Sequence, residues 1–177
     1  MEWQTIIPIV LGSGLVSAIF TNLLDRFLSA REAHRYNKFI ALTLAHDLEA
    51  FSWKCADLAT DHDLYDQSEG HAGSRIANPP DTFKIPDESF KGFDTEILDR
   101  VYRLPLSIRA AKSQIEFWDT VSGQDEAFGA AYEETISLGN EAIEIASEIR
   151  RKYDLLVRPI KFGKTTLQEI YIKKLKT

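Results

Sequence analysis

The side chains best suited to chemistry lie together between positions 57 and 71. This stretch holds five carboxylates and two histidines: Asp57, Asp61, His62, Asp63, Asp66, Glu69 and His71. Histidine nitrogens and carboxylate oxygens are common metal ligands, and Asp57 and Asp61 would share one face of a helix. With His46 about three helical turns upstream, the cluster of His46, Asp57, Asp61 and His62 is a candidate centre of a metal-dependent enzyme.

The spacing within this cluster does not match a known type of metal site. It contains no His-x-x-x-His pair, and its carboxylates do not alternate around a glycine as they do in a calcium-binding loop. An acidic helix end that runs into a loop is more commonly a solvated surface. A metal-dependent enzyme is therefore the third functional hypothesis, and we expect no metal, no cofactor and no catalytic residue.

Two further features have a chemical and a structural interpretation. Gly163-Lys164-Thr165 is similar to the end of a phosphate-binding loop, but Arg158 stands where the first glycine of that loop is required. Cys55 is the only cysteine, so an internal disulfide is excluded. It falls on the apolar face of a predicted helix, where a cysteine is more often a core residue than a nucleophile.

Charge is distributed unevenly along the 177 residues, whose net charge is −6. Residues 1–38 carry four basic and three acidic side chains, residues 39–154 carry eleven and twenty-three, and residues 155–177 carry six and one. The acidic middle block argues against a nucleic-acid partner, because phosphate contacts require a basic surface. The tail is expected to contact anionic lipid headgroups or acidic protein surface. Its basic residues are Arg158, Lys161, Lys164, Lys173, Lys174 and Lys176.

The elements that would position these groups begin with an uncharged N-terminal run. No charged side chain occurs from Trp3 to Leu24, and Ile6–Leu24 is mostly apolar. Nineteen helical residues span roughly 28 Å, close to the hydrocarbon thickness of a bilayer. The sequence therefore predicts a transmembrane anchor at residues 1–24. A buried core helix and a cleaved signal peptide are the alternatives, but the run has no basic segment before it.

The flanks of the predicted anchor indicate its orientation. Only Glu2 is charged on the N-terminal side, whereas four basic residues follow the run: Arg26, Arg31, Arg35 and Lys38. Basic residues favour the cytoplasmic side of a membrane. We therefore expect a single-pass protein of a bacterial inner membrane, with its N-terminus outside and its C-terminal domain in the cytoplasm.

One face of the predicted anchor is formed by small residues at helical spacing, Gly14, Ser17, Ala18 and Thr21. Small residues let helix backbones approach closely in lipid, so this face is a candidate for homo-oligomer formation. A pore subunit or other membrane-perturbing effector, as in toxin or phage-defence systems, is the alternative function. In that case polar residues of the anchor, including Asn22, would line the pore.

Residues 25–154 are predicted to form a mainly all-α bundle of about three long antiparallel helices. Apolar residues recur in steps of three and four in three runs, which start at Ala41, Ile97 and Phe128. The short connection 122–124 makes the second and third helices an antiparallel pair. Asp94 or Thr95 is the expected N-cap of the second helix, and Pro105 is expected to kink or split it.

Two segments depart from the helical pattern. Residues 62–93 contain the glycines and prolines of an irregular insertion, together with enough apolar residues to pack onto the bundle. Residues 155–177 form the basic C-terminal segment, which is expected to be a short hairpin or a short helix.

These observations favour a membrane-anchored, non-enzymatic interaction or scaffold protein. Its expected partners are the lipid bilayer, a cytoplasmic protein and a second copy of itself.

Overall fold

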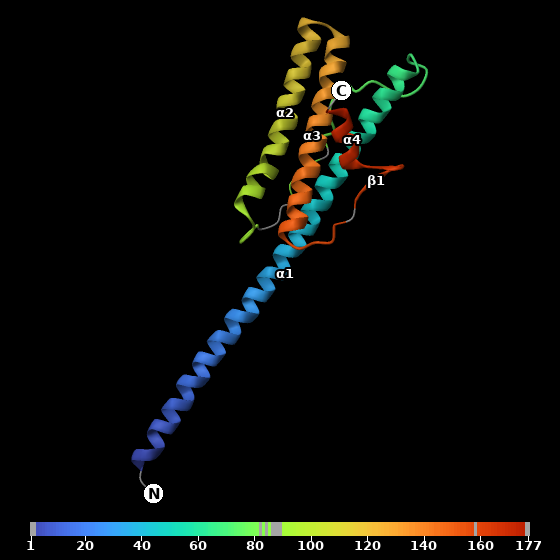
Figure 1. Cartoon of the computed structure of the whole chain (residues 1–177). Helices are drawn as coiled ribbons and strands as arrows, with labels where there is room; N and C mark the ends of the chain where they lie inside the picture. The colour runs from blue at the N-terminus through green and yellow to red at the C-terminus, as the bar shows by residue number, and fades with distance from the viewer. Residues whose placement is uncertain (1–2, 82, 84, 86–89, 158, 176–177) are drawn as a thin grey trace. The chain divides into compact units, whose positions relative to one another are not determined.

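The computed structural model describes the backbone of residues 3–81, 83, 85, 90–157 and 159–175, and their side chains from Arg26 onwards. This part of the chain is mainly helical, as predicted (Figure 1). Its helices are α1 (Trp3–Gln67), α2 (Thr95–Val121), α3 (Gln124–Lys152) and α4 (Leu167–Lys174). Two short strands, β1 (Lys161–Phe162) and β2 (Thr165–Thr166), precede α4.

Internal contacts divide the chain into two units, residues 1–39 and residues 40–177. Helix α1 contributes to both, and the helical bundle belongs to the second. Over the residues whose side chains are described, no helix has the length and apolar character needed to cross a bilayer. The predicted anchor at 1–24 lies outside those residues. So does its face of small residues, Gly14, Ser17, Ala18 and Thr21.

Two polar contacts fix the register of α1 against α3. Glu49 of α1 pairs with Arg150 near the end of α3, and Asp63 of α1 accepts a hydrogen bond at 2.7 Å from Tyr132 near the start of α3. The residue numbers rise along α1 as they fall along α3, so the two helices are antiparallel.

Helix α2 is also antiparallel to α3. Arg100 of α2 donates to Glu148 at 2.5 Å, and Lys152 pairs with Asp94, the residue that caps α2. It follows that the bundle part of α1 runs parallel to α2 (Figure 1). The predicted antiparallel order is therefore correct for the second and third helices and wrong for the first and second.

The irregular segment allows this parallel arrangement, because it returns the chain from the end of α1 to the start of α2. Helix α1 continues to Gln67, beyond position 62 where the irregular segment was expected to begin. Ile76, Phe83 and Phe93 of the returning segment are buried. The Phe83 ring packs against Phe51 of α1 with ring centroids 6.1 Å apart.

The three predicted apolar runs form the core. The buried residues at helical spacing include Ala41, Leu44, Leu48, Phe51 and Cys55 in α1, Ile97, Val101, Leu104, Ile108, Ala111 and Ile115 in α2, and Ala131, Thr135, Leu138, Ala142, Ile145 and Ile149 in α3. Asp94 caps α2 as predicted, accepting from the backbone N–H groups of Glu96 and Ile97. Helix α2 is not split at Pro105, because buried residues on both sides keep that turn packed in the core.

The C-terminal segment contains both of the predicted alternatives. Strands β1 and β2 pair antiparallel around Gly163, which has a φ of +63°. Helix α4 then starts with a reciprocal cap between Thr166 and Glu169. Its Tyr171 is completely buried, and the Tyr171 hydroxyl donates to the backbone carbonyl of Ser52 at 2.5 Å.

Gly139 allows this close approach of α4 to α3. A Cβ atom placed on Gly139 would lie 2.7 Å from both the Cβ of Cys55 and the Cζ of Tyr171. A Cβ on Gly129, in an exposed part of the same helix, would meet nothing within 4 Å. The same substitution at these two positions therefore separates packing from helix propensity.

We expect Gly139→Ala to lower the free energy of unfolding by about 1–3 kcal/mol, because overpacking outweighs the better helix propensity of alanine. Gly129→Ala should raise it by roughly 0.5–1 kcal/mol. Urea unfolding of the full chain in mild detergent, followed by far-UV circular dichroism, measures both changes. Equal effects of the two substitutions would contradict the close packing of Tyr171 on Gly139.

Candidate functional site

A groove of about 500 Å³ lies between the C-terminal part of α1, helix α3 and the tail formed by the hairpin and α4. Charged residues from α1 and α4, the phenol of Tyr132 and the ring of Phe162 all line it. The groove lies next to the acidic stretch that the sequence singles out, so its polar contacts indicate what that stretch does.

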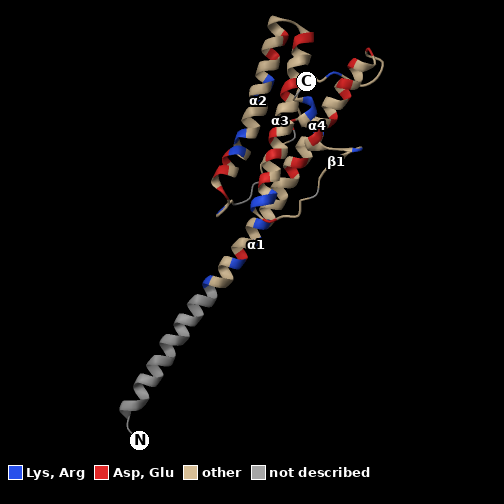
Figure 2. Ribbon diagram, in the orientation of Figure 1, with Lys and Arg blue, Asp and Glu red and all other residues tan. Residues whose placement is uncertain are grey.

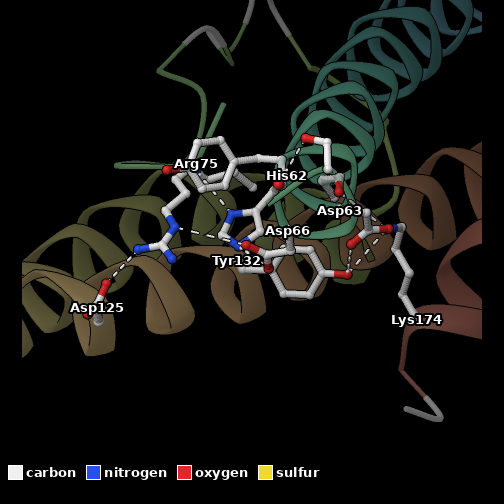
Figure 3. Close-up of polar contacts among 11 residues, drawn as sticks. His62, Asp63, Asp66, Arg75, Asp125, Tyr132 and Lys174 are labelled. Atoms are coloured by element: carbon white, nitrogen blue, oxygen red, sulfur yellow. Dashed lines mark hydrogen bonds and ion pairs between the residues drawn. The ribbon is translucent and has the colours of Figure 1, made fainter. Parts of the chain in front are cut away.

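The centre of the groove is an ion pair between Asp63 of α1 and Lys174 of α4 (Figure 3). Tyr132 of α3 donates to the same carboxylate at 2.7 Å, and its ring lies 5.3 Å from the Lys174 ammonium. Burial and the hydrogen bond to Asp63 raise the pKa of Tyr132, so this phenol stays protonated at neutral pH. The three groups join α1, α3 and α4.

His62 lies beside this ion pair and connects α1 to the returning segment. It is 7 % exposed, and its Nδ1 accepts a hydrogen bond from the backbone N–H of Ile76 at 3.1 Å. Its Nε2 faces a carboxylate oxygen of Asp66 at 3.4 Å, and its ring packs on Tyr132 with centroids 4.8 Å apart. Because Nδ1 is an acceptor, the proton of the neutral imidazole is on Nε2.

Burial lowers the pKa of His62 from its ordinary value near 6.5. The carboxylates of Asp66 and Asp63 act in the opposite direction, and the cations of Arg75 and Lys174 act with burial. Burial is the largest of these effects. The neutral form is also the only one that accepts the Ile76 hydrogen bond, so folding favours an uncharged His62.

Arg75 links the returning segment to the start of α3 through an ion pair. Its guanidinium donates to Asp125 at 2.5 Å and lies 3.9 Å from Asp66 (Figure 3). The same group lies over the rings of Tyr65 and Phe128, at 5.1 and 5.4 Å from their centroids. Arg75 thus contacts both α1 and α3 from the segment that connects α1 to α2.

Several polar groups beside the groove form hydrogen bonds and ion pairs with one another, so the cluster holds α1 against its neighbours. His62 holds a backbone N–H, Asp63 is shared by a lysine and a tyrosine, and Asp61 accepts from the hydroxyl of Ser74 at 2.5 Å. A nucleophile or general base would need a lone pair free to meet substrate. The Nδ1 lone pair of His62 and the carboxylate oxygens of Asp63 are instead bonded to other groups of the protein.

The predicted metal-site candidates are not brought together. His46 and Asp57 are exposed on α1, whereas His62 is buried and Asp61 is bonded to Ser74. No group of three or more histidine, cysteine or acidic side chains able to hold a metal ion occurs among the residues whose side chains are described. Cys55 is buried in the core, as expected, and burial strongly raises the pKa of its thiol.

The basic residues of the predicted tail have different surroundings. Lys174 is half-buried and paired with Asp63, whereas Lys161, Lys164 and Lys173 are exposed. Arg158 and Lys176 lie outside the described residues. On the other flank, Arg26, Arg31 and Arg35 are exposed and Lys38 is half-buried. Acidic residues are distributed over α2, α3 and the bundle part of α1 (Figure 2).

Two features of the structure were not anticipated. One is the ion pair of Glu49 and Arg150, whose side chains are only 10 % and 13 % exposed. The other is a row of large apolar residues on the outer face of α2, including Tyr102, Leu106 and Phe117. Their spacing is visible in the sequence, but it is less regular than the buried run on the same helix.

Comparisons with known proteins give no related protein in which the role of these residues is known. No family model matches the chain, and no curated protein and no solved structure is significantly similar to it.

The buried neutral His62 predicts a pH dependence of stability. Its pKa is near 6.5 in the unfolded chain and lower in the folded one, so below about pH 6.5 the unfolded state binds more protons. The free energy of unfolding should therefore fall as the pH drops through 6.5 towards the folded pKa. Urea unfolding of the full chain between pH 7.5 and about 5 measures this slope.

His62→Asn keeps a hydrogen-bond acceptor near the position of Nδ1 and cannot titrate, so its slope in this range should be smaller. His46→Asn makes the same change at an exposed position of α1 and should keep the wild-type slope. Identical slopes in wild type and His62→Asn would refute the uncharged, bonded state of His62.

Proposed function

We propose that this protein is a membrane-anchored, non-enzymatic interaction protein whose helical bundle lies on the cytoplasmic side of the membrane. The observation that carries the proposal is the uncharged run from Trp3 to Leu24, followed directly by basic residues. The run has the length of a membrane span and the flank has the charge of a cytoplasmic boundary.

The exposure of the flank agrees with this function. Arg26, Arg31 and Arg35 are all exposed on α1, where their charges are available to anionic headgroups. Phe27 and Leu28 between them are also exposed, at 66 % and 47 %. Basic side chains beside large exposed apolar ones are typical of a helix at the membrane interface, where cations and apolar atoms both find favourable surroundings.

The bundle supports binding rather than catalysis. Around its groove the titratable groups hold each other and the backbone, and the buried cysteine is held as a thiol. The outer surface, in contrast, carries several large apolar residues with more than half of their area exposed. Three of them, Leu106, Phe117 and Val121, lie on one face of α2, and large apolar residues exposed on one face of a folded domain are typical of an interaction surface. We infer that a cytoplasmic protein and further copies of this chain are the partners.

Membrane extraction tests the anchor. The full chain should stay in the membrane pellet after alkaline carbonate treatment of cells that express it. Leu15→Glu with Ile19→Glu places two acidic side chains at the centre of the predicted span, at a cost of several kcal/mol, and should move most of the protein to the supernatant. Immunoblotting of the two fractions measures the change.

Leu42→Glu with Phe39→Glu is the matched control, because both residues are exposed on α1 outside the predicted span. This variant should stay in the pellet. Release of the wild-type chain by carbonate would overturn the anchor, and retention of the Leu15→Glu, Ile19→Glu variant would show that another part of the chain holds it to the membrane.

A further inference from the structure

The outer face of α2 carries a row of large apolar side chains. Tyr102, Leu106, Phe117 and Val121 are between 50 % and 61 % exposed, although six other residues of the same helix are buried in the core. Helix α2 packs on α3 on one side of the bundle (Figure 1). On this second apolar face the Tyr102 ring contacts Phe90 of the returning segment, with ring centroids 6.1 Å apart, and the Phe117 ring contacts its neighbour Trp118, at 5.7 Å.

These residues lie in one strip along the helix, within whose arc Arg103 and Thr120 also fall. At 100° per residue, Tyr102, Leu106, Phe117 and Val121 fall within about 100° of arc, opposite the buried face. Ala110 and Ser113 fall within the same arc, halfway along the strip, and both are exposed. We call these six residues the outer strip. It is about 28 Å long, with large residues at both ends and small ones in the middle.

The outer strip has the same pattern in both directions. Tyr102 and Val121, Leu106 and Phe117, and Ala110 and Ser113 are all placed symmetrically about one point, between Ala111 and Lys112. If a second α2 lies antiparallel on the first with its midpoint at this point, each large residue meets a large one. The small residues meet at the centre, where the two backbones would be closest.

The charges beside the strip favour the same arrangement. Arg109 and Glu116 are exposed on the same flank, and neither is in an ion pair with another described residue. In an antiparallel helix pair like flanks meet, so Arg109 of each chain would lie near Glu116 of the other. In a parallel pair opposite flanks meet, and Arg109 would instead face the side of Arg103, which is already paired with Asp99 at 2.8 Å.

We propose that the outer strip of α2 is a homodimer interface, in which the α2 helices of two chains pair antiparallel about a twofold axis. The axis is perpendicular to the helices and lies between them, at the level of the midpoint between Ala111 and Lys112. The interface itself depends on residues of the bundle alone, so it stands or falls independently of the anchor.

Disulfide cross-linking tests the register. Leu106 of one chain should face Phe117 of the other, whereas the two copies of Leu106 should be about 16 Å apart along the axis, beyond the reach of a disulfide. An oxidised mixture of full-length Leu106→Cys and Phe117→Cys chains in mild detergent should therefore give a cross-linked heterodimer. Each variant alone should give little.

Two controls accompany this experiment. The wild-type chain reports any cross-link through the buried Cys55, and a mixture of Glu133→Cys and Ser137→Cys reports chance collisions at exposed positions of α3. A cross-link between two Leu106→Cys chains would mean parallel pairing and would overturn the proposal. So would the same yield from the α3 control as from the α2 mixture.

A charge exchange independently tests the predicted contact between Arg109 of one chain and Glu116 of the other. Arg109→Glu should weaken dimerisation about tenfold, because it replaces two symmetric attractions by repulsions. Arg109→Glu combined with Glu116→Arg restores opposite charges and should recover most of the loss. Analytical ultracentrifugation in detergent measures the dissociation constant, and circular dichroism checks that the fold is kept. Equal weakening by the single and the double variant would contradict the antiparallel contact.

Discussion

The arrangement of the bundle depends on the ion pair between Glu49 and Arg150. Both side chains are largely withdrawn from water, and the guanidinium donates to both carboxylate oxygens, at 2.7 Å for the Nη2 bond. Replacing such a pair by apolar residues changes stability little, but separating its members leaves a buried charge and costs several kcal/mol. The pair therefore acts on the register, because α1 cannot slide along α3 without separating it. Arg150 also donates to the carbonyl of Leu156, where the tail leaves α3.

The binding sites for the tail follow from this register. With Glu49 opposite Arg150, the next turns of α1 bring Ser52 and Cys55 opposite Gly139 and leave a space that Tyr171 fills. Further along the same face, Asp63 meets Tyr132 and receives Lys174. A shift of α1 by one turn would close the first space and remove the partner of the lysine. The tail is thus attached to positions that exist only when α1 and α3 are correctly aligned.

The sequence predicts the parts of this fold that are determined locally. The core-facing residues of the three long helices follow from periodicity, and the Asp94 cap follows from the chemistry of a single side chain. The parallel course of α1 and α2 could not be predicted, because it depends on where buried residues such as Phe83 return the connecting segment across the bundle. The last turn of α1 was missed for a similar reason. Its residues are mostly polar and lack a helical pattern, and contacts such as that of His62 with Ile76 hold it in place.

The distribution of exposed apolar and paired polar side chains supports the proposal that the bundle acts through contacts with other chains. Around the groove, buried and half-buried polar groups are paired, so little free energy is available there for binding a polar ligand. On α2 the opposite holds, because four large side chains are still 50–61 % exposed, and burial of the remaining area would gain each of them about half of the 1.5–3 kcal/mol that complete burial of such a side chain gives. A helix that only faced solvent would gain nothing from apolar residues at these positions.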